Sequence, residues 1–263
     1  MKISILLPYK ENFSPHYAGA VSLFVSQTVQ SSKFKSNITI YGNTNYKKKL
    51  LKNYVNLILK KGILQSSSKI YVKQFIDSQK NNKPDIIEVH NRPNYIKQIK
   101  DQTNSKITLY FHNDPLNMNG SMTVKERNYL LINLDAIIFN SEWSKKRFFI
   151  NLNKTKNEID HKTHVVHQSS SNVKINFKKK ENIISFVGKL NKAKGYDLFG
   201  KAIVRILEKH KNWKAVVFGD EHRERLNYTH KNMKIFGFRK HSNILKYLEK
   251  VSISIICSRW EEP

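Results

Sequence analysis

The chain has 263 residues, enough for one large domain or two smaller ones, and its single cysteine, Cys257, excludes an intramolecular disulfide and indicates a reducing compartment such as the cytoplasm. Its formal net charge of +27 is compatible with a nucleic-acid partner, with an anionic membrane surface, or with a compositional bias toward lysine. Because the lysines are spread along the whole length, we favour bias, with a general attraction to anions as its consequence. No segment reaches the ~18 apolar residues of a membrane-spanning helix, and the start of the chain predicts a strand rather than a signal peptide.

The first part of the chain alternates short apolar runs with segments of helical periodicity. The expected strands are residues 2–7, 38–41, 85–89, 106–111, 135–139 and 163–167. The expected helices are residues 19–32, a basic helix from about 46 to 60, residues 69–79, and a helix after Ser141, which is a suitable N-cap. The basic helix predicts a surface element packed on the sheet, and contact with anionic lipid headgroups is compatible with it.

A second α/β unit follows a polar segment without periodicity. Residues 168–180 are the expected linker, between a domain at 1–170 and another at 181–263. The expected strands of the second unit are residues 183–187, 214–218, 233–236 and 251–256. Strands that alternate with helices predict two parallel, Rossmann-like sheets, with a cleft between the domains. The second unit ends just after a strand, so we expect an incomplete domain in a chain truncated at its C-terminal end.

The most informative segment is residues 187–195 (VGKLNKAKG), between an apolar strand and a helix whose apolar face begins at Leu198. Open α/β sheets bind ligands at this position, and the start of a helix favours an anion. Lys189 and Lys194 add two positive charges, so the segment predicts a phosphate or diphosphate site. Residues 195–202 nearly match a phosphate-binding P-loop, but Ala202 replaces the metal-binding hydroxyl, and an ordinary helix is the better interpretation.

Metal and dinucleotide sites lack support in the sequence. His161, His164 and His167 are spaced by three, but in a strand such residues face opposite ways. The chain has no D-x-D pair and no G-x-G-x-x-G motif, so we expect neither a bound metal nor a nicotinamide or flavin cofactor.

Two further strand ends carry polar residues. Gly19 and Ala20 allow close approach of a ligand after the first strand, although a plain tight turn is the better interpretation of this loop taken alone. His112 follows the strand at 106–111, where a functional or a structural histidine is equally compatible with the pattern. Residues 88–93 (EVHNRP) form a similar and more ambiguous cluster.

Together these segments resemble the family 4 glycosyltransferases, particularly the bacterial members that build lipopolysaccharide or other surface glycans. The residues that carry the resemblance are 6–11, 19–22, 87–93, 110–115, 139–144, 187–195, 217–220 and 258–263. The resemblance implies the GT-B fold of two Rossmann-like domains. It also implies transfer of a sugar from a nucleotide-diphosphate donor to the hydroxyl of a glycan or lipid-linked acceptor, with retention at the anomeric carbon and without a metal.

The resemblance also implies roles for individual residues. Lys189 stands where the family usually has arginine, and Lys194 matches the usual lysine before a glycine, so both would hold the donor diphosphate together with Gly188 and Gly195. Glu262 matches the first glutamate of the family's pair and His112 matches the histidine of the first domain, so both would meet the donor sugar. Gly19 and Ala20 match the loop near the phosphates and the acceptor.

Two other interpretations stay open. A non-catalytic GT-B protein would bind a sugar nucleotide without turnover, and a nucleic-acid-binding protein would use the excess of positive charge. We expect no specific nucleic acid as partner, because no known reader module occurs in the chain. We expect the protein in the cytoplasm, with a peripheral contact at the inner face of the membrane as an option, and we expect the chain as given to be inactive.

Overall fold

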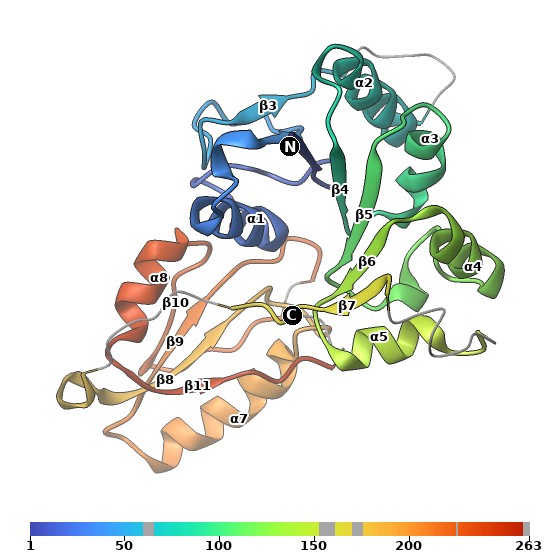
Figure 1. Ribbon diagram of the computed structural model, residues 1–263. Helices are drawn as coiled ribbons and strands as arrows, with labels where there is room; N and C mark the ends of the chain where they lie inside the picture. Colours follow the sequence, from blue (N-terminus) through green and yellow to red (C-terminus); the bar gives the residue numbers. More distant parts are fainter. Residues whose placement is uncertain (60–65, 153–160, 170–175, 225, 260–263) are drawn as a thin grey trace. The chain divides into compact units, whose positions relative to one another are not determined.

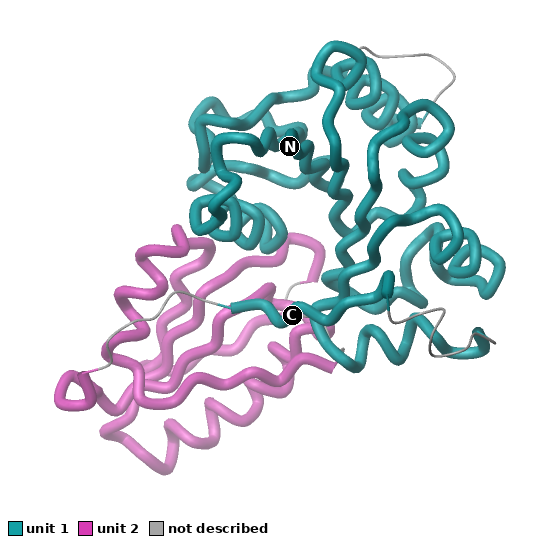
Figure 2. The backbone as a smooth tube through the Cα atoms, viewed as in Figure 1, with its two compact units in different colours: residues 1–169, 263 teal, residues 170–262 magenta. Residues whose placement is uncertain are grey.

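The computed structural model describes residues 1–59, 66–152, 161–169, 176–224 and 226–259. The chain divides into two compact units, residues 1–169 and 170–262 (Figure 2). The division lies inside the segment 168–180 that the sequence predicts as a linker. Each unit is an α/β structure built on a parallel sheet (Figure 1).

The first unit has a sheet of seven parallel strands in the order β3-β2-β1-β4-β5-β6-β7. Leu6 lies opposite both Tyr41 and Val89, so the carboxyl ends of β1 and its two neighbours reach the same edge of the sheet. The strands are β1 (Ile3–Leu6), β2 (Ile38–Gly42), β3 (Tyr54–Asn56), β4 (Ile86–His90), β5 (Lys106–Phe111), β6 (Ala136–Phe139) and β7 (Thr163–Val165).

Helices cover both faces of this sheet, as the apolar character of its strands requires. Side chains alternate along β1: Ile5 packs in one cluster with α1, whereas Leu6 packs in another with α2 to α5. The helices are α1 (Ala20–Ser31), α2 (Ser67–Asn82), α3 (Ile96–Lys100), α4 (Val124–Asn133) and α5 (Glu142–Phe149). Short 3₁₀ turns lie at Lys35–Asn37, Pro93–Tyr95 and Pro115–Asn117.

The basic helix expected from residue 46 to 60 is wrong for the described residues 46–59. The chain there forms a loop followed by β3, which pairs with β2. Tertiary contacts override the helical periodicity: the Tyr54 ring stacks on Phe13 with centroids 4.9 Å apart, and Asn53 donates a hydrogen bond from its side chain to the Ile38 carbonyl. No amphipathic helix is therefore available in this stretch to rest on a membrane.

The second unit has four parallel strands in the order β10-β9-β8-β11. Ile184 and Phe186 pack with α7 on one face of the sheet, and Ile183 and Phe218 pack with α8 on the other. The elements are β8 (Glu181–Val187), α7 (Tyr196–Lys209), β9 (Lys214–Phe218), β10 (Met233–Ile235), α8 (His241–Leu248) and β11 (Val251–Ile255), with a 3₁₀ turn at Phe177–Lys179.

Helix α7 buries a narrower face than its sequence predicts. Phe199, Ile203 and Leu207 are buried at the expected spacing of four residues. Leu198, expected on the same face, is 48% exposed. The helix begins directly after Gly195, as the sequence predicts.

Candidate functional site

The loop between β8 and α7 gathers the residues expected to bind a diphosphate. It runs from Gly188 to Gly195. Lys189 is exposed and Lys194 is half-buried. A methyl group placed on Gly188 would stand 3.9 Å from Lys194 Cβ, so the two ends of the loop lie against each other. The loop therefore holds two lysines next to the start of a helix, which is an arrangement that attracts an anion.

Asn191, which the sequence reasoning did not single out, organises this loop. Its Oδ1 accepts a hydrogen bond of 3.0 Å from the Lys194 N–H, and its carbonyl accepts one of 3.1 Å from the Tyr196 N–H. Its side-chain amide also reaches Glu221 Oε2 at 3.4 Å. An asparagine a few residues before a helix is a known turn former, and that signal could have identified it.

Two glycines make the loop sterically possible. Gly195 is buried and has φ +72°, and an added Cβ would stand 1.9 Å from the Cys257 carbonyl oxygen. Gly219, at the end of β9, has φ +137°, and its Cβ would stand 1.8 Å from the Gly188 carbonyl oxygen. Since both positions combine a positive φ with contact to another backbone, each admits only glycine.

The start of α7 is less open to a ligand than the sequence suggests. The carboxylate of Asp197 lies in the first turn and accepts hydrogen bonds of 2.7 and 2.8 Å from Arg259. These bonds lower the pKa of Asp197 to about 2, and N–H groups of Asp197 and Leu198 contribute to the shift. The Asp197 carboxylate thus partly compensates the positive end of the helix dipole of α7. The binding of an anionic ligand at this position therefore depends more on Lys189 and Lys194.

The segment after β11 packs onto the same loop. The Arg259 N–H donates to the Ala193 carbonyl at 3.0 Å, and the Cys257 thiol donates to the Gly195 carbonyl at 3.0 Å. This segment leads toward Glu262, which lies outside the described residues.

In the first unit, an internal carboxylate sits at the expected phosphate loop. Gly19 precedes α1 and Ala20 is its exposed first residue. Glu11 Oε1 accepts a hydrogen bond of 3.0 Å from the Ser22 N–H, and a Cβ on Gly19 would stand 1.9 Å from this oxygen. Glu11 therefore occupies the position at the helix start that an anion would favour.

His112 lies directly after β5 and is only 3% exposed. Its ring stacks on Tyr110 at 4.5 Å, and Phe24 of α1 meets it edge-on at 5.1 Å. Burial, and then the neighbouring His90, lower the pKa of His112 to about 2. The imidazole is therefore neutral at physiological pH, and the contact with Phe24 places it beside the helix that Gly19 and Ala20 begin.

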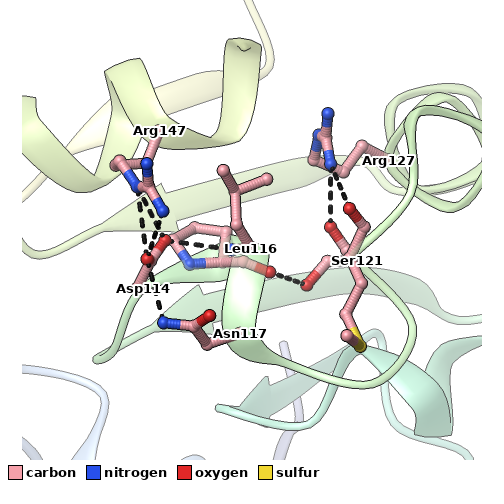
Figure 3. Close-up of polar contacts among 8 residues, drawn as sticks. Asp114, Leu116, Asn117, Ser121, Arg127 and Arg147 are labelled. Atoms are coloured by element: carbon pink, nitrogen blue, oxygen red, sulfur yellow. Dashed lines mark hydrogen bonds and ion pairs between the residues drawn. The ribbon is translucent and has the colours of Figure 1, made fainter. Parts of the chain in front are cut away.

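The loop that follows His112 is held by two arginines (Figure 3). Asp114 accepts hydrogen bonds from the Arg147 guanidinium, the shortest at 2.7 Å, and from the Leu116 N–H at 3.0 Å. Buried Arg127 of α4 donates to the carbonyls of Ser121 and Met122, and to that of Ile150 at the end of α5. Because these side chains connect the loop to α4 and α5, the backbone after His112 is fixed in place.

In the part of the chain that the structure describes, no three His, Cys, Asp or Glu side chains converge as metal ligands. Over the same residues, none of the helices has the length and apolar character needed to cross a bilayer.

One segment of the chain is similar in sequence to a known family. Residues 168–263 match the family of glycosyl transferases group 1. This segment contains the whole β8–α7 loop with Lys189 and Lys194. No curated protein sequence matches the chain.

Solved structures show the fold of the whole chain. Sucrose-phosphate synthase from Thermosynechococcus elongatus superposes with a TM-score of 0.73 at 12% identity, over 100% of this chain and 77% of that one. HepE of Anabaena in complex with UDP-glucose gives 0.69 at 12% identity, over 100% and 76%. The lipopolysaccharide outer core galactosyltransferase WaaB gives 0.60 at 14% identity, over 98% and 74%. The expected fold, GT-B with parallel, Rossmann-like sheets, is confirmed.

Proposed function

We propose that the protein is a retaining glycosyltransferase that moves a sugar from a nucleotide-diphosphate donor to an acceptor hydroxyl. The observation that carries this proposal is the β8–α7 loop, which holds two lysines at a strand end inside the segment that matches glycosyl transferases group 1. In open α/β sheets, this is the position where ligands bind.

Transfer of the sugar requires positive charge near the glycosidic bond that breaks. Negative charge grows on the leaving diphosphate, and fixed cations stabilise it. Lys189 and Lys194 supply these charges in the proposed mechanism, so that no metal is required. Lys189 replaces an arginine of the family pattern, which keeps the charge but removes the two-pronged hydrogen bonding of a guanidinium.

The sugar side of the site is proposed to use His112 and Glu262. A neutral His112 acts there as a hydrogen-bonding group rather than as an acid, because its pKa is about 2. Glu262 is assigned to the hydroxyls of the donor sugar, and Gly19 and Ala20 to the region near the phosphates and the acceptor. The Glu11 carboxylate at the start of α1 means that a phosphate there would have to displace it.

The substrate classes follow by analogy with the similar structures. HepE is in complex with UDP-glucose, and WaaB is a lipopolysaccharide galactosyltransferase. We propose a glycan or lipid-linked acceptor in surface-glycan or lipopolysaccharide synthesis, and a reaction in the cytoplasm. The charge of +27 supports a peripheral contact with the anionic inner face of the membrane.

Calorimetry with UDP tests the donor site. Lys194→Ala is expected to weaken UDP binding about tenfold or more, which corresponds to about 1.4 kcal/mol. Lys209→Ala is the matched control, because it removes the same charge at the other end of α7, roughly 20 Å away. Equal affinities of the wild type and Lys194→Ala would contradict the proposal. Turnover of a nucleotide sugar, measured on the full-length protein, then separates an enzyme from a non-catalytic binding protein.

A polyanion-binding role is the second candidate, favoured by the net charge of +27. One similar structure is an alpha-glucosyltransferase in complex with UDP and a 13-mer DNA, with a TM-score of 0.61 at 13% identity. Filter binding of duplex DNA across a salt series tests it. Tight binding with a steep salt dependence would favour this role, whereas weak binding at physiological salt would leave the sugar nucleotide as the ligand.

A further inference from the structure

A chain of side chains connects His112 to two residues of the EVHNRP segment that the proposed mechanism does not use. Glu88 Oε1 lies 2.6 Å from His90 Nε2, and His90 Nδ1 lies 2.8 Å from His112 Nε2. At the far end, the side-chain nitrogen of Gln168 lies 2.7 Å from His112 Nδ1. Both imidazoles therefore have a partner at each ring nitrogen.

The two rings are enclosed. His90 is 0% exposed and His112 is 3% exposed, whereas the Glu88 side chain is 28% exposed. His90 and His112 both stack on Tyr110, with interplanar angles of 14° and 17°. Burial and stacking on Tyr110 therefore restrict the rotation of both rings.

The chemistry of the partners fixes the direction of the hydrogen bonds. The Glu88 carboxylate only accepts, so His90 Nε2 carries the proton that it donates. An imidazole that carries its one proton on Nε2 accepts at Nδ1, and in this arrangement His112 Nε2 donates to His90 Nδ1. A neutral His112 that carries its proton on Nε2 has a lone pair on Nδ1. That nitrogen accepts from the Gln168 amide, in agreement with the position of the Gln168 side-chain nitrogen.

We propose that Glu88 and His90 are positioning residues that hold His112 as the Nε2–H tautomer, so that His112 Nδ1 accepts a hydrogen bond from a hydroxyl of the sugar substrate. The Gln168 amide occupies the place of that hydroxyl in this structure. The inference deepens the proposed function and rests on its assignment of His112 to the sugar.

The backbone of His112 is fixed independently of its ring. The His112 N–H donates to Asn91 Oδ1 at 3.1 Å, and the Asn140 side-chain amide donates to the His112 carbonyl at 2.9 Å. These contacts set the position of the residue, and the Glu88–His90 pair sets which ring nitrogen is the acceptor.

The class of ligand follows from the acceptor. A lone pair on a neutral imidazole matches the proton of a hydroxyl, whereas a carboxylate or phosphate offers it no proton at neutral pH. The low pKa of His112 supports this, because the ring does not take up a proton to meet an anion. We therefore assign this nitrogen to a sugar hydroxyl and not to the diphosphate.

The test is the tautomer of His112, read from the ¹⁵N chemical shifts of its ring nitrogens at pH 7. In the wild type we expect protonated Nε2 and unprotonated Nδ1. Glu88→Gln keeps the size and shape of the side chain, but its amide can also donate a hydrogen bond to His90 Nε2. The hydrogen bonds from residue 88 through His90 to His112 can then run in either direction. We expect both tautomers of His112 in this variant, and the wild-type tautomer in Asp101→Asn, which changes an exposed carboxylate of the same unit. A wild type with protonated Nδ1, or a single unchanged tautomer in Glu88→Gln, would overturn the proposal.

Calorimetry adds a functional readout with UDP, UDP-glucose and UDP-galactose. The nucleotide sugar that binds more tightly than UDP should lose about three- to tenfold in affinity in Glu88→Gln, while UDP itself binds as before. An equal loss for UDP and the nucleotide sugar, or no loss for either, counts against a role in sugar binding. Absence of UDP binding in the wild type would contradict the proposed function, and the tautomer measurement would still decide the role of Glu88 and His90.

Discussion

Replacing Gly195 by alanine tests whether the β8–α7 loop has the close packing described above. Two costs add up. Alanine at φ +72° costs about 1–2 kcal/mol, because its Cβ approaches the following carbonyl. The new Cβ also stands 1.9 Å from the Cys257 carbonyl oxygen, and such overpacking costs about 1–3 kcal/mol. We expect a total destabilisation of about 2–5 kcal/mol.

Gly237→Ala is a matched control for the first of these costs. Gly237 lies in the same unit and has a similar φ of +66°, but an added Cβ meets nothing within 4 Å. This variant should therefore lose only about 1–2 kcal/mol, the conformational part. The difference between the two variants isolates the contact between the loop and the segment after β11.

Hydrogen exchange measured by mass spectrometry on the peptides of β8 and α7 gives the free energy of opening of the second unit, independently of the first. Gly195→Ala should accelerate exchange there more than Gly237→Ala, and it should also weaken UDP binding. Equal effects of the two substitutions, or wild-type protection in Gly195→Ala, would refute the packing of Gly195 against Cys257.

Three other predictions concern the first unit. Arg127→Met leaves the carbonyls of Ser121, Met122 and Ile150 without a donor and should cost about 3 kcal/mol in urea unfolding, and wild-type stability would contradict its structural role. Glu11→Ala removes the carboxylate at the start of α1 and should cost about 1 kcal/mol, with a smaller loss in Glu11→Gln. His112 has a pKa of about 2 when folded and about 6.5 when unfolded, so the unfolded chain binds the extra proton between these values. The free energy of unfolding should therefore fall by about 1.4 kcal/mol per pH unit below about 6.5, and a His112→Asn variant that kept this dependence would contradict the assignment.

The described strands other than β3 could be predicted because they are apolar runs with clear ends. Residues 106–111 and 214–218 were predicted with the bounds that the structure has. The helix after Ser141 was predicted from its N-cap, and Ser141 and Ser144 form a capping box there. Local signals of this kind depend on a few neighbouring residues, which a sequence displays.

The sequence did not predict β3, whose conformation depends on contacts with residues far away in the chain. The segment around Tyr54 has helical periodicity, yet it adds a strand to β2 because its ring stacks on Phe13, some forty residues away. Helix α4 was not predicted, although Thr123 and Glu126 form a capping box that could have indicated it.

The sequence predicted the positively charged residues of the candidate site, but not the carboxylates of the chain itself that lie at the same helix starts. The sequence indicated Lys189, Lys194 and Gly195, and the structure places them in one loop. It did not reveal that Asp197 and Glu11 meet the starts of α7 and α1, because each contact depends on a side-chain direction that spacing does not fix.

The central claim is that the β8–α7 loop binds the diphosphate of a nucleotide donor. Calorimetry of wild type and Lys194→Ala with UDP and with uridine tests it most directly, because the two ligands differ only in the diphosphate. The account predicts that the substitution weakens UDP binding about tenfold or more and leaves uridine binding unchanged. An equal loss for both ligands, or no loss for UDP, would contradict it.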